Sequence, residues 1–360
     1  MRGAPAPAVA PSIPVKICVV TGGVGGARFL LGVKAFLGWD PTGPAPDPGP
    51  DGPADTVTAV VNTADDIRLH GLQICPDLDS CLYTLSGAAD TERGWGRQGE
   101  TWTVSGELAG YGAEAPWFSL GDKDIATHLV RTRMLDAGYP LSAVTAALAG
   151  RWRPGVTLLP MSDDRVETHV VVEDPEHDPA DGTEPGLVAL HFQEWWIRHR
   201  AGLAPRSITP IGADTATPAP GVLDAIAEAD IVLVAPSNPV VSVGTVLAVP
   251  GIREALRTTA APVVGMSPLI GGRPVRGHAD ACLAAIGVDS TAEAVGRHYG
   301  ARSGGQRDGH GGILDAFLIA EHDSAEIPGV QVVRAPLLMT DPTATAAMVA
   351  RCLDAVDVRR

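Results

Sequence analysis

The sequence has few aromatic residues and few basic ones for its length. Phe, Trp and Tyr make up 4% of the 360 residues, and 42 Asp and Glu outnumber 27 Lys and Arg, which gives a formal net charge of −15. A chain of this charge is not expected to bind the phosphate backbone of DNA or RNA, and so few rings offer no stacking platform for single strands. A local basic site for a small anion stays open.

Long apolar runs and paired cysteines are also missing. No apolar stretch is long enough to cross a bilayer, so no membrane partner is expected. Residues 1–14 hold one Arg and no continuous apolar segment, so we expect a disordered extension rather than a signal peptide. The five cysteines form no CxxC pair and no cluster with zinc spacing, which favours a reduced, cytoplasmic location.

Apolar strands that alternate with helices are what the sequence does have. Residues 15–20 predict a strand, a glycine-rich turn follows at 21–28, and a helical pattern continues to about Leu37. This order opens a doubly wound sheet. Other strand-like segments lie at 56–61, 156–160, 166–173, 230–235, 262–266 and 313–319, and 187–199 is strand-like at first and then mixed. Helix-like spacing occurs at 77–86, 104–112, 122–138, 141–150, 221–229, 252–258, 291–299 and 343–354.

The alternation predicts an α/β fold: a doubly wound, Rossmann-like, mostly parallel sheet with a mainly helical insertion and a small additional α/β region. The strands on either side of the helical middle belong to one sheet, so the nucleotide-binding core is expected at 15–76 and 205–360, and the insertion at 77–204. Stretches rich in Pro, Gly and polar residues predict surface loops. These stretches are 40–55, 174–186 and 300–312.

Polar loops directly follow four of the predicted strands. They lie at 21–28, 62–66, 236–239 and 267–273. Ligands of an open parallel sheet bind beyond the carboxyl ends of its strands, so these loops are expected to converge on one crevice.

The first of these loops is rich in glycine. Gly22, Gly23, Gly25 and Gly26 let backbone N–H groups approach a phosphate closely. Their spacing matches neither a dehydrogenase fingerprint nor a P-loop, and an ordinary tight turn between strand and helix is the alternative.

Four carboxylates lie close together in the sequence. They are Asp65, Asp66, Asp77 and Asp79. Hard oxygen ligands beside a phosphate site predict Mg²⁺, which would neutralise charge on a diphosphate leaving group. The alternative is that Asp77 or Asp79 caps the helix that begins near Leu78.

Two further segments are candidates for ligand contacts. Lys123, in a polar turn before a helix, is suited to a phosphate, although an ordinary surface salt bridge is the alternative. Ser237 and Asn238 follow the most apolar strand and offer a hydroxyl and an amide, whereas the prolines on either side also fit a purely structural turn. The ten histidines are scattered and predict no Ser–His–Asp triad.

Taken together, several motifs resemble the CofD/FbiA family, in the family's order and over roughly residues 15–350. The matching stretches are 22–28, 76–79, 120–128, 159–164, 191–196, 235–239 and 267–272. Two segments, 23–28 and 196–200, are more similar to the actinobacterial branch of the family than to the archaeal branch.

The resemblance implies a reaction. The phosphoenolpyruvyl group of enolpyruvyl-diphospho-5'-guanosine moves to the ribityl hydroxyl of the deazaflavin 7,8-didemethyl-8-hydroxy-5-deazariboflavin, GMP leaves, and dehydro coenzyme factor 420-0 forms with Mg²⁺ as cofactor. The resemblance also implies a homodimer.

The resemblance carries roles over to individual residues. The inserted region, near Asp79 and Lys123, would hold the deazaflavin. The catalytic residues would be Asp65, Asp66 and Asp79, and the metal ligands would be Asp65, Asp66, Asp77 and Asp79. The residues that hold the guanosine diphosphate donor would be Gly22, Gly23, Gly25, Gly26, Arg28, Ser237, Asn238, Ser267 and Gly271.

Three other functions stay open at this point. One is transfer of 2-phospho-L-lactate from lactyl-diphospho-guanosine. Another is a non-enzymatic nucleotide-binding regulator of the gluconeogenesis-factor type, against which the motifs at 76–79 and 121–124 favour the transferase. The third is a Rossmann dehydrogenase, which Asn62 disfavours because it stands where an acidic partner for the ribose is expected.

Overall fold

A single parallel sheet forms the centre of the protein. The computed structural model describes residues 14–47, 54–113, 115, 117–178, 184–302 and 311–359. The strands of the sheet are β1 (Lys16–Thr21), β2 (Thr56–Val61), β5 (Thr157–Pro160), β9 (Ile231–Val234), β10 (Val263–Met266), β13 (Ala316–Ala320) and β14 (Gln331–Ala335). Their spatial order is β14-β13-β10-β9-β1-β2-β5, and every neighbouring pair is parallel.

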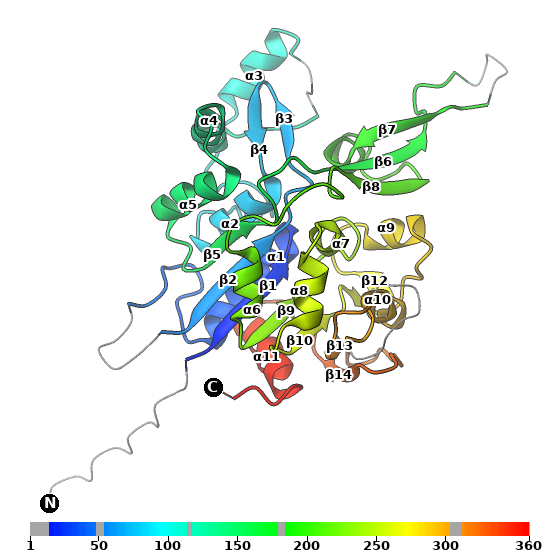
Figure 1. Ribbon diagram of the computed structural model, residues 1–360. Helices are drawn as coiled ribbons and strands as arrows, with labels where there is room; N and C mark the ends of the chain where they lie inside the picture. Colours follow the sequence, from blue (N-terminus) through cyan, green and yellow to red (C-terminus); the bar gives the residue numbers. More distant parts are fainter. Residues whose placement is uncertain are drawn as a thin grey trace, which may run out of the picture.

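Helices cover both faces of this sheet (Figure 1). Side chains alternate along β1, so Ile17 and Val19 pack on one face while Cys18 and Val20 pack on the other. The first face carries α1 (Gly23–Phe36), α2 (Pro76–Leu85), α5 (Leu141–Trp152) and α11 (Pro342–Asp354). The second carries α6 (Val222–Ala227), α7 (Val243–Ala248), α8 (Ile252–Thr258), α9 (Ala279–Ala285) and α10 (Ala292–Tyr299). Burial on both faces explains why the strands are almost wholly apolar.

Smaller elements stand beyond the carboxyl ends of the strands. The hairpin of β3 (Ile67–Leu69) and β4 (Leu72–Ile74) lies near α3 (Thr103–Gly110) and α4 (Asp122–Asp136) (Figure 1). A three-stranded antiparallel sheet has the order β7-β6-β8. Its strands are β6 (Glu167–Glu173), β7 (Leu187–His191) and β8 (Ser207–Ile211). The short strands β11 (Leu269–Ile270) and β12 (Arg273–Pro274) pair with each other.

The predicted α/β fold with a mostly parallel, doubly wound sheet is confirmed. The strand-like part of 187–199 is β7, which ends at His191, and the mixed part contains a turn of π-helix, Glu194–Arg198. The sequence pattern did not indicate the β3–β4 hairpin, the strands β8 and β14, or the helices α7 and α9. None of the helices in the described ranges is long and apolar enough to span a membrane.

Part of the sequence-based organisation lies outside the described residues. This applies to 1–13 of the expected extension and to 48–53, 179–183 and 303–310 of the expected loops. The division of the chain at 77 and 205 stays a prediction. Within it, β5 falls inside the proposed insertion but pairs with β2 in the central sheet, and β8 falls inside the proposed core but pairs with β6.

Candidate active site

A cavity opens where the strand order of the sheet reverses. From β1 the chain proceeds to β2 on one side, whereas β9 lies on the other, and ligands of such sheets bind at this point. The cavity has a volume of about 810 Å³, within the range of small-molecule sites. Of the residues predicted for the site, Gly22, Gly23, Gly25, Arg28, Asp65, Asp77, Asp79, Ser237, Asn238 and Ser267 line it.

The loop after β1 and the loop after β9 are joined directly at this cavity. The Ser237 hydroxyl donates a hydrogen bond to the carbonyl oxygen of Gly22 (2.7 Å) and accepts one from its N–H (3.3 Å). Gly22 precedes α1 and has no side chain to cap it, and the N–H of Gly23 donates to the carboxylate of Asp77. The N–H groups that follow in the first turn of α1 are suited to a phosphate group.

Two of the glycines in this loop are required by close packing. A Cβ atom on Gly26 would lie 1.8 Å from Oγ1 of Thr21, and one on Gly22 would lie 2.7 Å from Oδ2 of Asp77. Gly26 therefore lets α1 approach β1, and Gly22 lets Asp77 approach the loop. Gly26 itself does not line the cavity.

Asp65 and Asp77 form an acidic pair at the cavity wall. Asp77 accepts a hydrogen bond from Nδ2 of Asn62 (2.9 Å), and Asn62 is itself fixed because its Oδ1 accepts the hydroxyl of Thr245 (2.7 Å). Burial raises the pKa of Asp77 to about 6. Burial, with the nearby charge of Asp77, also raises the pKa of Asp65 well above its ordinary value.

The donor set of this pair fits a divalent cation. Oδ1 of Asp65 is buried and has no hydrogen-bond partner in the described part of the chain. Within the described ranges, no three His, Cys, Asp or Glu side chains are arranged as a complete metal site. Mg²⁺ is commonly held by one or two carboxylates, with water and substrate phosphates as the other ligands, and the Asp65–Asp77 pair provides that number.

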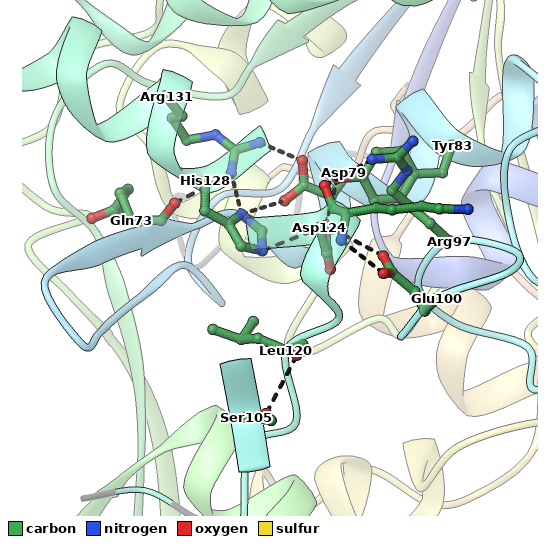
Figure 2. Close-up of polar contacts among 11 residues, drawn as sticks. Gln73, Asp79, Tyr83, Arg97, Glu100, Ser105, Leu120, Asp124, His128 and Arg131 are labelled. Atoms are coloured by element: carbon green, nitrogen blue, oxygen red, sulfur yellow. Dashed lines mark hydrogen bonds and ion pairs between the residues drawn. The ribbon is translucent and has the colours of Figure 1, made fainter. Parts of the chain in front are cut away.

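Asp79 belongs to a different cluster, which α4 completes. Arg131 donates a hydrogen bond from Nη2 to Oδ1 of Asp79, and Figure 2 shows the guanidinium and the His128 ring directed at this carboxylate. Both Asp79 and Arg131 are buried. The Tyr83 hydroxyl donates to Oδ1 of Asp124, which also lies 3.5 Å from Nε2 of His128.

His128 lies between Arg131 and the two carboxylates of this cluster. Nη1 of Arg131 lies 3.0 Å from Nδ1 of His128. Oδ2 of Asp79 lies 3.7 Å from the same ring nitrogen. In the described part of the chain this oxygen has no hydrogen-bond partner, although Asp79 lines the cavity. The unpartnered oxygen is itself buried, in a residue of the cavity wall.

The structure does not bring every predicted residue to the cavity. Asp66 is buried and does not line it. Lys123 is directed elsewhere, since its Nζ donates to the carbonyl oxygen of Gln98 (3.1 Å). Gly271 is also outside the lining, and its N–H donates to the carboxylate of Asp323. Ser267 lines the cavity, but its hydroxyl donates to the Leu269 carbonyl within its own turn (3.0 Å).

Sequence reasoning missed several residues of the site. Asn62 was considered only as a missing acidic partner, and Arg276 and His278 were not considered at all. Trp95, Trp117, Phe118, Phe192 and Trp196 supply aromatic walls. The motif at 191–196 was the available signal, because it ends in Trp195, which is buried, and Trp196, whose ring lies 5.3 Å from that of His278.

The same motif also supports the acidic loop from behind. Nε2 of His191 lies 3.1 Å from the carbonyl oxygen of Asp66, and Nε2 of Gln193 donates to that of Asp65 (3.3 Å). Nδ1 of His191 accepts the N–H of Gln193, so the ring is neutral and donates through Nε2. Burial lowers the pKa of His191, in agreement with this neutral state.

Comparisons with known proteins show the family to which the chain belongs. The family described as 2-phospho-L-lactate transferase CofD matches residues 17–336. A Nocardia farcinica protein named phosphoenolpyruvate transferase is 57% identical over 352 residues, which cover 98% of this chain and 98% of that protein. A protein of the same name from Mycobacterium sp. strain KMS is 59% identical over 335 residues, which cover 93% of this chain and 97% of that protein.

The fold is also known from a crystal structure. A UPF0052 family protein from Bacillus halodurans superposes with a TM-score of 0.55 at 18% identity, over 94% of this chain and 99% of that one. At this identity the likeness concerns the fold alone. The sequence matches reach further, because they extend over nearly the whole chain at more than half identity, and they confirm the resemblance that the motifs indicated. The chain belongs to the CofD family of transferases.

Proposed function

We propose that the protein transfers the phosphoenolpyruvyl group of enolpyruvyl-diphospho-5'-guanosine to the ribityl hydroxyl of 7,8-didemethyl-8-hydroxy-5-deazariboflavin. The hydroxyl oxygen bonds to the phosphorus that carries the enolpyruvyl group, the bond from this phosphorus to the oxygen of GMP breaks, and the hydroxyl proton is released. The products are dehydro coenzyme factor 420-0 and GMP. The relatives at 57% and 59% identity are named phosphoenolpyruvate transferase, which favours the enolpyruvyl donor over the lactyl donor.

The cavity supports the proposal because two kinds of surface line it. The start of α1 and the loop held by Ser237 suit the diphosphate of the donor. Tyr83, Trp95 and Trp117 provide flat apolar surface of the kind that a deazaflavin ring requires. Phosphoryl transfer needs mainly positioning and charge stabilisation, and a cavity that binds both substrates side by side supplies the first.

Asp79 is proposed as the residue that receives the acceptor hydroxyl. Its Oδ2 is buried, and Asp79 belongs to the cavity wall, while Arg131 holds its other oxygen. A hydroxyl placed against Oδ2 would donate its proton there as the bond to phosphorus forms. Asp66 does not line the cavity, so only a role in supporting the loop at 62–66 is proposed for it.

Mg²⁺ is the proposed cofactor, and Asp65 and Asp77 would hold it. The unpartnered Oδ1 of Asp65 and the raised pKa values of both carboxyls support a cation between them. When bound, the ion supplies charge neutralisation at the diphosphate.

We also propose a cytoplasmic homodimer. The five cysteines are all free and buried, which agrees with a reducing compartment, and light scattering of the purified protein measures the oligomeric state.

A product assay tests the proposed function. Purified protein is mixed with the deazaflavin, Mg²⁺ and either the enolpyruvyl or the lactyl donor, and the deazaflavin is analysed by mass spectrometry. We expect a gain of the phosphoenolpyruvyl group from the first donor, and loss of this gain when EDTA replaces Mg²⁺. A gain only from the lactyl donor would reverse the donor assignment, and no gain from either would refute the transfer.

A further inference from the structure

Two arginines face the cavity without an acidic partner. Arg28 lies on α1, and Arg276 lies between β12 and α9; both line the cavity. Within the described part of the chain, neither guanidinium forms an ion pair. Other arginines of the described chain, such as Arg133 and Arg351, also form no ion pair, but they do not line the cavity. Arg28 and Arg276 are distinguished by their shared position at the cavity.

The position of Arg276 is determined by a neighbouring turn. Its Nη2 donates a hydrogen bond to the carbonyl oxygen of Gly94 (3.1 Å). Gly94 has a φ of +78°, and a Cβ atom there would lie 2.9 Å from Nη1 of Arg276. The positive φ accounts for glycine at this turn, and the absence of a side chain there leaves the guanidinium close to the backbone. The contact uses one of the five N–H donors of the side chain and leaves the others for a ligand.

The two arginines also influence each other. Partial burial lowers the pKa of Arg276, although the residue as a whole is exposed, and the positive charge of Arg28 lowers it further. Like charges at one cavity wall repel, so their proximity is unfavourable until an anion lies between them. An anion that accepts from both guanidinium groups would remove this repulsion and form charge-assisted hydrogen bonds.

The proposed donor carries two kinds of anionic group. Its diphosphate already has partners in the start of α1 and in a cation held by Asp65 and Asp77. Its three-carbon acid carries a carboxylate for which neither of these provides a partner. A planar carboxylate matches the paired N–H donors of guanidinium groups.

The geometry points to Arg28 and Arg276 as the subsite for the carboxylate of the transferred three-carbon acid. This inference rests on the proposed function and adds a specificity element to it. The subsite makes the donor bind more tightly than GDP, which has the diphosphate but lacks the carboxylate. It acts on the enolpyruvyl and the lactyl donor alike, since both carry this group.

Calorimetric titration tests the subsite without turnover. The dissociation constants of enolpyruvyl-diphospho-5'-guanosine and of GDP are measured with Mg²⁺ for the wild type, Arg276→Gln and Arg28→Gln. A hydrogen bond to a charged group corresponds to about a tenfold to hundredfold change in binding. We expect each variant to weaken donor binding by about this factor and GDP binding by less than about twofold.

Arg351→Gln is the matched control, because it makes the same charge change at an exposed position of α11 outside the cavity. Its two dissociation constants should equal those of the wild type. If Arg276→Gln weakened the binding of the donor and of GDP equally, Arg276 would be a diphosphate ligand and the proposal would be overturned. Equal dissociation constants of the donor and GDP for the wild type would also overturn it. Product formation by the wild type is measured separately, so failure of the transfer reaction is distinguished from failure of the subsite.

Discussion

Arg131 of α4 donates a hydrogen bond to Asp79 of α2, and both side chains are buried. The pair leaves one oxygen of Asp79 without a partner in the described part of the chain, at a residue that lines the cavity. The charge of Asp79 also acts on Arg131. Burial alone would lower the pKa of Arg131, but the carboxylate of Asp79 raises it overall. The ion pair therefore has a double role: it connects the two helices and it orients a catalytic candidate.

The first prediction concerns the stability of this pair. Arg131→Met leaves the Asp79 carboxylate buried without its cation, and removal of one partner of a buried ion pair costs about 3–5 kcal/mol of unfolding free energy. Asp79→Asn is expected to be similarly costly. The double variant removes both charges, so its loss should be smaller than the sum of the single losses. Urea denaturation of the four proteins measures this coupling, and strict additivity would contradict it.

The second prediction separates stability from turnover at the same residues. Asp79→Asn combined with Arg131→Met should regain part of the lost stability but no activity, because the proposed proton acceptor is still missing. General base catalysis contributes about 10²–10⁴ to a rate, so kcat should fall at least about 100-fold while the KM of the donor changes little. Steady-state kinetics on the double variant checks this. Near-normal kcat in a folded double variant would remove Asp79 from the proposed mechanism.

Short-range pattern explains what could be predicted from the sequence. The strand, glycine loop and helix at 15–37 follow each other directly, so periodicity and turn residues indicate them. Ser237 and Asn238 were predicted at the cavity because they come immediately after an apolar strand. In a parallel sheet such positions meet at one edge whatever the rest of the fold does.

Long-range pairing explains what could not be predicted. The four carboxylates were considered one group, yet Asp79 is bound by Arg131, which lies 52 residues further along the chain. Gly94 and Arg276 are 182 residues apart. No local pattern reports such contacts, because they depend on how the helices pack. The role of Asn62 in holding Asp77 could not be predicted either, because its amide contacts Asp77 of α2 and Thr245 of α7.

The third prediction is a pH dependence of the metal-free protein. Burial raises the pKa of Asp77 from its ordinary 3.8 to about 6, so the folded state holds a proton more tightly than the unfolded state. The contribution of this proton to stability is complete below the unfolded pKa and is lost as pH rises through about 6. The free energy of unfolding of Asp77→Asn, relative to that of the wild type, should therefore rise by about 1–3 kcal/mol from pH 4 to pH 8.

Urea denaturation in EDTA at these two pH values measures this difference, and saturating Mg²⁺ should reduce the advantage of the variant at pH 8 because the ion stabilises the wild-type carboxylates. A stability difference that is the same at both pH values would contradict the raised pKa.

The last prediction concerns two adjacent glycines that the sequence cannot tell apart. A Cβ atom on Gly26 would lie 1.8 Å from Thr21 Oγ1, whereas one on Gly25 would lie 3.8 Å from the nearest atom, the Pro236 carbonyl oxygen. Gly26→Ala must push α1 away from β1 and should cost about 1–3 kcal/mol, as overpacking does. Gly25→Ala should leave the melting temperature nearly unchanged but raise the KM of the donor, because Gly25 lines the cavity. Thermal denaturation and kinetics of both variants, compared with the wild type, measure the two effects, and equal melting temperatures would show that the packing of α1 on β1 does not require Gly26.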